Sequence, residues 1–320
     1  MSGDFGAQVD YLSLSFDADN LGGVHASGFL EFILDALRLA GVAFIADKRP
    51  AGIYGYERSY ILNRVVLGGV SSSGLIAYTD STSSKKNKGF YLSLSGLACL
   101  GLDVKAFIKQ IQVFEPHITR IDLAVDYLDG LVNYDYVKQA YFSGLFNSGG
   151  REPRHNVIEP KVHGEKVGGY TLYVGKRGGA KFCRAYEKNY QLLDEAVDNP
   201  FPHWFRLEIE ARSVDCDIPL ALFDDYNAFL LGFYPRLFSQ LPTPSHVVPS
   251  DVSGVPLKLS FDSPQTQVNL AHLKHYARQS YGGLLNVMKH HLKLTDEEIV
   301  KSLLPSDKRV PRRLQLPIEA

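Results

Sequence analysis

A tyrosine between two basic residues is the part of this sequence best suited to covalent chemistry. Residues 181–188 read KFCRAYEK, and the alternation of side chains in a strand places Arg184, Tyr186 and Lys188 on one face. A phenol with a pKa of about 10 is a weak nucleophile at neutral pH, and the two cations favour its phenolate form. The pattern predicts attack by Tyr186 on a phosphate, although a tyrosine in a basic strand is more often structural.

A second strand carries two glutamates spaced two positions apart. Residues 203–212 read HWFRLEIEAR. Alternation turns the apolar residues of this strand toward a core and places Arg206, Glu208 and Glu210 on the opposite face. Both carboxylates can then reach a single metal ion. Two exposed glutamates on a solvated sheet face are the simpler explanation.

A third strand, HITRIDLAVD at residues 117–126, adds two carboxylates and a guanidinium on one face, Arg120, Asp122 and Asp126. If the strands are neighbours, Asp122, Glu208 and Glu210, with Asp126 as a less certain member, form a cluster of oxygen ligands that suits Mg²⁺ or Mn²⁺. Clustered acids repel one another, so their adjacency would itself argue for a metal ion. Arg120 and Asp122 could instead form an ion pair on a solvated surface.

Composition narrows the classes of protein. The 320 residues include 34 Lys and Arg against 35 Asp and Glu, so a nucleic-acid site must be a local patch. The three cysteines lack zinc-ligand spacing, which favours free thiols in a reducing cytoplasm. The N-terminus does not have the pattern of a secretory signal, and no apolar run of about 18 residues occurs. We therefore expect a soluble cytoplasmic protein that does not contact a membrane.

The hydrophobic patterns predict an α+β fold, with a mainly antiparallel twisted sheet and helices packed on one face. Alternating or apolar runs bounded by Gly and Ser predict strands at residues 11–16, 60–67, 75–79, 89–95, 117–126, 169–175, 181–188 and 203–212. Apolar residues at helical spacing predict helices at residues 27–40, 103–114, 134–146, 189–197 and 217–238. Residues 151–168 have no clear period and contain two prolines, which predicts a long loop. We detect no internal repeat.

Three regions follow from these patterns. Residues 1–240 are predicted to form the catalytic domain, and residues 241–268 a Pro-rich linker. Residues 269–320 are predicted to form a basic helical appendage, which could contact DNA or simply dock as a helix pair. The lysine-rich segment 81–88 could touch a phosphate backbone, but a solvated hairpin tip explains it equally well.

Competing catalytic motifs are absent from the sequence. It contains neither a P-loop nor a Gly-x-Ser-x-Gly elbow. The pair His290-His291 lacks the intervening apolar residue of a His-hydrophobic-His metal motif. A tyrosine recombinase is also disfavoured, because no Arg/His/Arg constellation lies near a C-terminal tyrosine.

At these residues the sequence resembles the replication initiation factor family, the rolling-circle Rep proteins of filamentous phages and small plasmids. The segments that carry the resemblance are TRIDLAVD (119–126), YVGKR (173–177), FCRAYEK (182–188) and WFRLEIE (204–210), with the weaker YLSLSG (91–96). They occur in the family's order over residues 10–240. The sequence departs from the family at Gly178-Gly-Ala180, where relatives tend to carry a Ser after the basic residues.

The resemblance implies an origin-specific, metal-dependent DNA nickase and strand transferase. It assigns the nucleophile to Tyr186, which would keep the 5′ phosphate and leave a 3′ hydroxyl for extension, and it assigns Mg²⁺ or Mn²⁺ to Asp122, Glu208 and Glu210. Beyond what the resemblance implies, we predict that Arg120, Lys176, Arg177, Arg184, Lys188 and Arg206 bind phosphate or DNA, and that Tyr190 is the first alternative if Tyr186 is not the nucleophile.

The partners implied are a single-stranded, cruciform or supercoiled DNA origin and a bacterial host's helicase and polymerase, and a homodimer is compatible with them. The alternative is a phage- or plasmid-derived DNA-binding regulator of the same fold that has lost the chemistry. The four residues Tyr186, Asp122, Glu208 and Glu210 favour the enzyme, because a regulator has no need of all four.

Overall fold

A computed structural model describes most of the chain. The described residues are 4–21, 26–66, 69–80, 83, 87–160, 162–163, 166–191, 201–214, 216–247, 257 and 284–303. The chain divides into two compact units, residues 1–259 and residues 260–320. The finer division at residues 240 and 268 stays a prediction. No helix among the described residues is long and apolar enough to cross a membrane.

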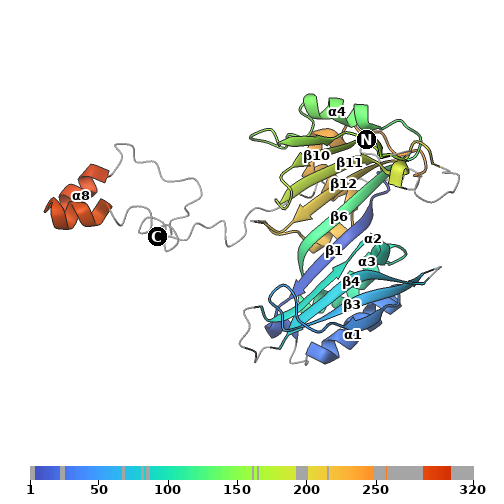
Figure 1. The fold of residues 1–320 in the computed structure, drawn as a ribbon, viewed down its shortest axis with the longest axis horizontal. Helices are drawn as coiled ribbons and strands as arrows, with labels where there is room; N and C mark the ends of the chain where they lie inside the picture. Colours follow the sequence, from blue (N-terminus) through green and yellow to red (C-terminus); the bar gives the residue numbers. More distant parts are fainter. Residues whose placement is uncertain are drawn as a thin grey trace. The chain divides into compact units, whose positions relative to one another are not determined.

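One ten-stranded sheet forms the centre of the first unit (Figure 1). Its order is β2-β3-β4-β5-β1-β6-β12-β11-β10-β7, and all neighbouring strands are antiparallel. The strands are β1 Gln8–Phe16, β2 Ile45–Lys48, β3 Arg58–Val66, β4 Gly69–Thr79, β5 Gly89–Leu94, β6 His117–Tyr127, β7 His155–Ile158, β10 Thr171–Gly175, β11 Lys181–Glu187 and β12 Phe205–Arg212. A separate hairpin joins β8 Val162–His163 to β9 Lys166–Val167. The predicted α+β class is confirmed.

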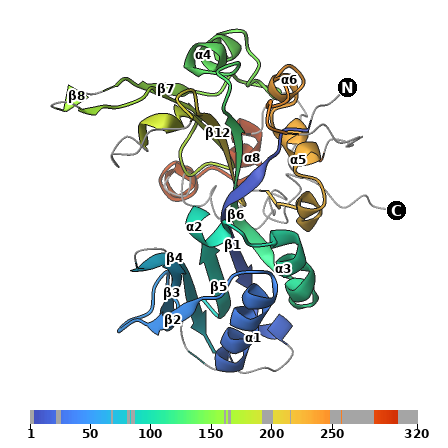
Figure 2. The ribbon, with the colours of Figure 1, turned by 90° about the vertical axis from the view of Figure 1, so that its right-hand side faces the viewer.

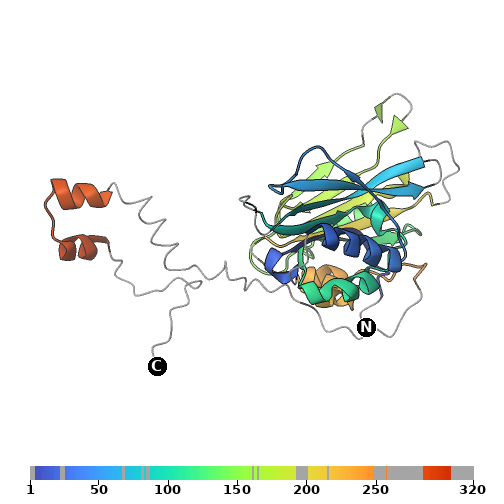
Figure 3. The same cartoon turned by 90° about the horizontal axis from the view of Figure 1, so that it is seen from below.

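Helices cover one face of this sheet. The α-helices of the first unit are α1 Ala26–Leu39, α2 Gly96–Cys99, α3 Val104–Ile111, α4 Tyr134–Phe142, α5 Tyr226–Phe233 and α6 Pro235–Phe238. Figure 3 shows α1 in blue, α3 in green and the orange helices on the same side of the strands. Alternate residues of the strands, such as Leu123, Val125, Leu207 and Ile209, are fully buried in the core on this side. The opposite side of the same strands therefore carries their polar residues.

The two halves of the sheet repeat one topology. In the first half, β1 is followed by α1 and then by β2, β3, β4 and β5, and the order outward from the centre is β1-β5-β4-β3-β2. In the second half, β6 is followed by α4 and then by β7, β10, β11 and β12, and the order outward is β6-β12-β11-β10-β7. Figure 2 shows β1 and β6 between the two halves. The repeat lies in the path of the backbone, and the sequence gives no sign of it.

Several predicted elements differ from the structure. The segment 151–168, predicted to be a loop, contains β7 and the short hairpin β8–β9, and the four-residue strand β2 was missed. Residues 217–238, predicted as one helix, divide into a 3₁₀ turn Leu220–Phe223, α5 and α6. Asp225 caps α5 by accepting a hydrogen bond from Ala228 N, and Pro235 prevents α5 from continuing because it has no N–H.

Three other elements end earlier than predicted or lie partly outside the described residues. Helix α4 ends at Phe142 instead of residue 146, just before Gly144 adopts a positive φ of 74°. A 3₁₀ turn occupies Lys188–Gln191, but the rest of the predicted helix 189–197 lies outside the described residues. The same holds for most of the lysine-rich segment 81–88. In the second unit, helical residues Val287–His291 and α8 Asp296–Leu303 are described.

Glycines shape the hairpin that carries Tyr186. Gly178 has a φ of 78° and Gly175 a φ of 99°, whereas Gly179 does not adopt a positive φ. A Cβ on Gly175 would lie 2.6 Å from the Lys181 carbonyl oxygen. Gly175 therefore permits both the left-handed backbone and the close approach of the strands.

Candidate active site

The predicted site residues lie together on the polar face of the sheet. Cross-strand pairing places Glu210 opposite Asp122, and Arg206 opposite Asp126. On the other side of β12, Arg184 lies opposite Glu208, and Tyr186 opposite Arg206. The side chains are buried, with Glu208 and Glu210 each 7% exposed. The alternative of two glutamates on a solvated surface is therefore wrong.

Tyr186 is enclosed by groups of both charges. The guanidinium carbon of Arg184 lies 4.6 Å from the centre of its ring, and the Lys188 ammonium lies 5.7 Å from it. The phenol oxygen lies 3.5 Å from Glu208 Oε2, a long hydrogen bond that a small movement would shorten. The ring is 4% exposed, so its hydroxyl faces a carboxylate in a largely dry site.

The protonation state of Tyr186 differs from the expectation that the two cations favour a phenolate. Burial and, to a smaller extent, the Glu208 carboxylate together raise the pKa of Tyr186 to about 12, against the opposing influence of Arg184 and Arg206. Desolvation of the anion outweighs the attraction of the cations. Tyr186 is thus a neutral phenol at physiological pH and needs a proton acceptor before it can attack.

Arg184 has an unused donor beside this tyrosine. One of its terminal nitrogens donates to Glu208 Oε2, but its Nε is buried without a hydrogen-bond partner in the described residues. Burying an N–H without an acceptor costs free energy. Such a donor commonly marks the place of a ligand oxygen, and a phosphate would satisfy it.

Arginines pair with the predicted metal ligands Asp122 and Glu210. Arg120 donates to both oxygens of Asp122 and lies 3.0 Å from Glu210 Oε2. Arg212 Nε lies 2.5 Å from Glu210 Oε1. Within the described ranges, no group of three or more His, Cys, Asp or Glu side chains is arranged to hold a metal ion. In this arrangement the arginines offset the mutual repulsion of the acids, so the adjacency of the acids does not by itself require an ion.

A second buried ion pair joins Asp126 to Arg206. Arg206 Nε and Nη2 each donate to Asp126 over 2.7 Å, and Nη1 donates to Asp10 over 2.9 Å. Trp204 Nε1 and Gln8 Nε2 also donate to Asp126. The guanidinium expected to bind phosphate is therefore held by two carboxylates, and its contact with DNA stays a prediction.

Asp10 and Gln8 were missed as members of the site. Val9 pairs with Leu123 and Tyr11 with Asp122, so a bulge in β1 accommodates Asp10 as an extra residue. Bulges re-aim side chains, and this one turns Asp10 toward Arg206. The pattern of residues 8–16 does not predict the bulge.

The remaining predicted residues lie farther from Tyr186. Lys176 and Arg177 are exposed in the turn that follows β10, whereas Tyr186 pairs with Thr171 at the other end of that hairpin. Tyr190 lies in the 3₁₀ turn beside Gly169. Their roles in DNA binding or as an alternative nucleophile stay predictions. Cys99, Cys183 and Cys216 are buried and form no disulfide with one another.

The structure thus has an antiparallel sheet that is covered by helices on one face and holds a buried tyrosine among arginines and carboxylates on the other. A family model described as replication initiation factor matches residues 116–304, which is more than half of the chain. The chain belongs to the replication initiation factor family. The matched region contains Tyr186, Asp122, Glu208 and Glu210, so its general role is in the initiation of replication.

One solved structure is similar over much of the chain. It is a rolling circle replication initiator protein from Geobacillus stearothermophilus, with 21% sequence identity and a TM-score of 0.47. The similarity covers 74% of this chain and 80% of that chain. No curated protein sequence matches the chain.

The buried Asp122 predicts a pH dependence of stability. Burial raises the pKa of Asp122 to about 6 from an ordinary 3.8, and Arg120 only partly opposes the increase. The folded state therefore binds the proton more tightly than the unfolded state, and the contribution of Asp122 to stability falls as pH rises from about 4 to about 6. We expect the difference in the free energy of unfolding between wild type and Asp122→Asn to change across this window. Urea denaturation at several pH values measures it, and a constant difference would contradict the assignment.

Proposed function

We propose that the protein is a rolling-circle replication initiator that nicks and rejoins one DNA strand through Tyr186. The observation that carries the proposal is the setting of that phenol, whose oxygen lies 3.5 Å from Glu208 and whose ring lies beneath Arg184. A nucleophile, a proton acceptor and a phosphate-binding cation are together there, as transesterification requires. Membership of the replication initiation factor family supports the same reaction.

The proposed reaction exchanges one phosphodiester for another. Glu208 takes the proton of the Tyr186 hydroxyl while the phenol oxygen forms a bond to phosphorus. The bond from phosphorus to the 3′ oxygen breaks, and that oxygen takes up a proton. The products are a 5′-phosphotyrosine and a free 3′ hydroxyl, and the phosphotyrosine bond keeps the free energy needed for later rejoining. Proton acceptance by a positioned carboxylate typically contributes about 10²–10⁴ in rate.

Arg184 is proposed to hold the reacting phosphate. Its unsatisfied Nε supports this role, since a non-bridging phosphate oxygen would accept the hydrogen bond that the described residues leave unmade. Its contact with Glu208 places the same guanidinium beside the proton acceptor. Arg184 therefore acts by positioning the phosphate and by opposing its negative charge.

We also propose that the reaction uses a divalent cation. Mg²⁺ or Mn²⁺ would polarise the phosphate when bound. The facing carboxylates Asp122 and Glu210 would hold it only after Arg120 moves away from them. The proposed substrate is an origin in single-stranded, cruciform or supercoiled DNA. The proposed partners are a host helicase and polymerase. The protein would act in the cytoplasm of a bacterium that carries a plasmid or phage.

Removal of the proposed nucleophile is expected to abolish the covalent product. Wild-type protein incubated with a supercoiled plasmid that carries the origin of its own replicon should give a protein–DNA adduct on a denaturing gel. Tyr186→Phe should give none, because it lacks the attacking oxygen, whereas the matched control Tyr190→Phe should behave as wild type. An adduct that persists in Tyr186→Phe and disappears in Tyr190→Phe would move the nucleophile to Tyr190, and no adduct from any folded protein would favour the inactive regulator.

Replacement of the proton acceptor is expected to change the pH profile of nicking. The Tyr186 phenol has a pKa of about 12, so without Glu208 its deprotonation depends on hydroxide. We expect Glu208→Gln to lose about 10²–10⁴ in adduct formation near pH 7 and to recover about tenfold per pH unit as pH rises. Single-turnover rates measured between pH 6 and about pH 9 test this. A variant with the wild-type pH profile would show that Glu208 is not the acceptor.

The cation is tested separately from the tyrosine. We expect one Mn²⁺ to bind the protein in electron paramagnetic resonance titrations, and Asp122→Asn and Glu210→Gln to weaken that binding, because each removes a ligand. Chelation with EDTA should stop adduct formation without unfolding the protein. Equal binding by wild type and both variants would remove Asp122 and Glu210 as ligands, and full activity in EDTA would remove the cation from the reaction.

A further inference from the structure

A row of tyrosines continues the polar face of the sheet away from the catalytic residues. Tyr91 on β5 is its centre, with the Tyr54 ring 5.6 Å away and the Tyr56 ring 6.2 Å away and nearly parallel. The Tyr11 side chain on β1 interacts with Tyr91 and Ser93. These four residues, Tyr11, Tyr54, Tyr56 and Tyr91, are called the tyrosine row below.

The tyrosine row is connected to the candidate active site by one arginine. The Arg120 guanidinium lies 4.3 Å from the centre of the Tyr11 ring and contacts Asp122 and Glu210 on its other side. Strand β5, which carries Tyr91, is four positions from β11, which carries Tyr186. At about 4.8 Å between neighbouring strands, the distance from β5 to β11 is on the order of 20 Å. A single strand of several nucleotides can span this distance.

The repeated topology shows how the two halves of the polar face differ. Strands β1 and β5 occupy the places in the first half that β6 and β12 occupy in the second. The second half presents Asp122, Glu208 and Glu210, whereas the first half presents Tyr11, Tyr91 and serines. Charged groups suit the reacting phosphate, and aromatic rings suit the faces of unpaired bases.

The backbone of Tyr54 has a strained conformation, although its side chain is not held in place by burial in the core. Its φ is 55°, in the left-handed region that non-glycine residues rarely adopt. Asn87 Nδ2 donates to the Tyr54 carbonyl oxygen over 2.5 Å and fixes the turn. The side chain is nonetheless 64% exposed. Backbone strain that presents an exposed ring is typical of a functional position.

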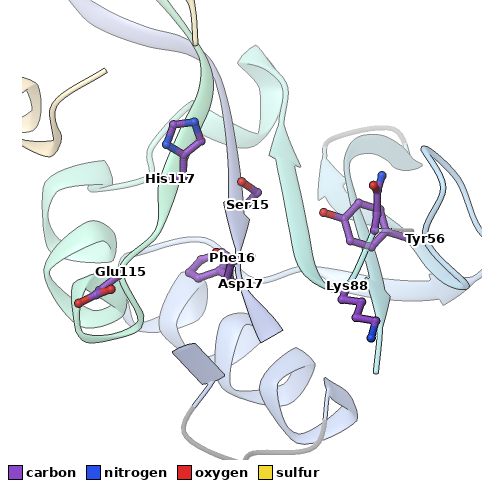
Figure 4. Close-up of a pocket in the computed structure, with 8 residues that line it drawn as sticks. Ser15, Phe16, Asp17, Tyr56, Lys88, Glu115 and His117 are labelled. Carbon is purple, nitrogen blue, oxygen red and sulfur yellow. The ribbon is translucent and has the colours of Figure 1, made fainter. Parts of the chain in front are cut away.

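A pocket of about 340 Å³ lies at the far end of the tyrosine row (Figure 4). Its lining includes Tyr56, Ser15, His117 and Lys88. In Figure 4, Ser15 lies between His117 and Tyr56. Asp17 and Glu115 also line the pocket, so Lys88 does not make it a positively charged site, and the Tyr56 ring is the group that it offers to an unpaired base.

We propose that the tyrosine row binds unpaired bases of the DNA strand that reacts at Tyr186. This inference rests on the proposed function, because that function supplies a single strand beside the site. The row would stack bases without reading their sequence, since every base has an aromatic face. It would thereby position the scissile phosphate over Arg184.

Binding to single-stranded DNA is the direct test. We would use fluorescence anisotropy with a labelled oligothymidylate of about 20 nucleotides, and expect Tyr91→Ala and Tyr54→Ala each to weaken binding about tenfold. Tyr91→Phe should bind as wild type because it keeps the ring. The slope of affinity against salt should not change, because stacking releases no counterions. The matched control is Phe142→Ala on α4, since that side chain is 65% exposed and lies outside the row.

A stability measurement separates a functional role of Tyr54 from a structural one. Tyr54→Gly removes the ring and relieves the positive φ, so we expect weaker DNA binding with an unchanged or higher melting temperature. Wild-type affinity in folded Tyr54→Ala and Tyr91→Ala would overturn the proposal, as would an equal loss in Phe142→Ala. These outcomes are distinct from failure of the proposed reaction, which would appear as no adduct from wild-type protein that still binds the oligonucleotide.

Discussion

Buried pairs of arginine and carboxylate hold the polar face of this protein together. Arg206 is buried and pairs with Asp126 and Asp10, whereas Arg120 and Arg184 are only partly buried and pair with Asp122, Glu210 and Glu208. Removing one partner of the buried pair between Arg206 and Asp126 leaves an unpaired buried charge and costs about 3–5 kcal/mol. Ion pairs therefore link β1, β6, β12 and β11, and the arginines in these pairs are the residues that we propose contact DNA.

This constraint shapes the chemistry of Tyr186. A site whose charges are already paired offers little net positive potential to a phenolate, so burial dominates and the phenol stays protonated. The reaction then depends on a proton acceptor in contact with the phenol, and Glu208 is in that place. The same pairing allows several carboxylates to lie close together, because the arginines offset their mutual repulsion. Any ion that binds Asp122 and Glu210 competes with Arg120.

The repeated topology gives one sheet two kinds of surface. A strand, a helix and four further strands occur in each half with the same order, and the two central strands β1 and β6 pair along their length. Because the halves are joined as one continuous sheet, residues on their polar faces form one surface. The half that contains Tyr186 carries charged side chains, and the other half carries tyrosines and serines, which we propose bind a strand of DNA.

Much of this could be predicted from local patterns. Alternation in residues 117–126, 181–188 and 203–212 was enough to assign Asp122, Tyr186, Glu208 and Glu210 to polar strand faces, because a strand has a period of two residues. Helix α1 and the meander β3–β4–β5 were predicted for the same kind of reason. Short or irregular elements such as β2 and β7 were not, since four residues give too little periodicity to recognise.

The sequence by itself therefore determined the face of each strand on which the candidate site residues lie. Only the tertiary structure decided which charges meet. Strand order and register placed Arg120 between Asp122 and Glu210, and a bulge turned Asp10 toward Arg206. Burial, which depends on the whole fold, then kept Tyr186 a neutral phenol. Pairing, register and desolvation are long-range properties, and a local pattern of residues does not contain them.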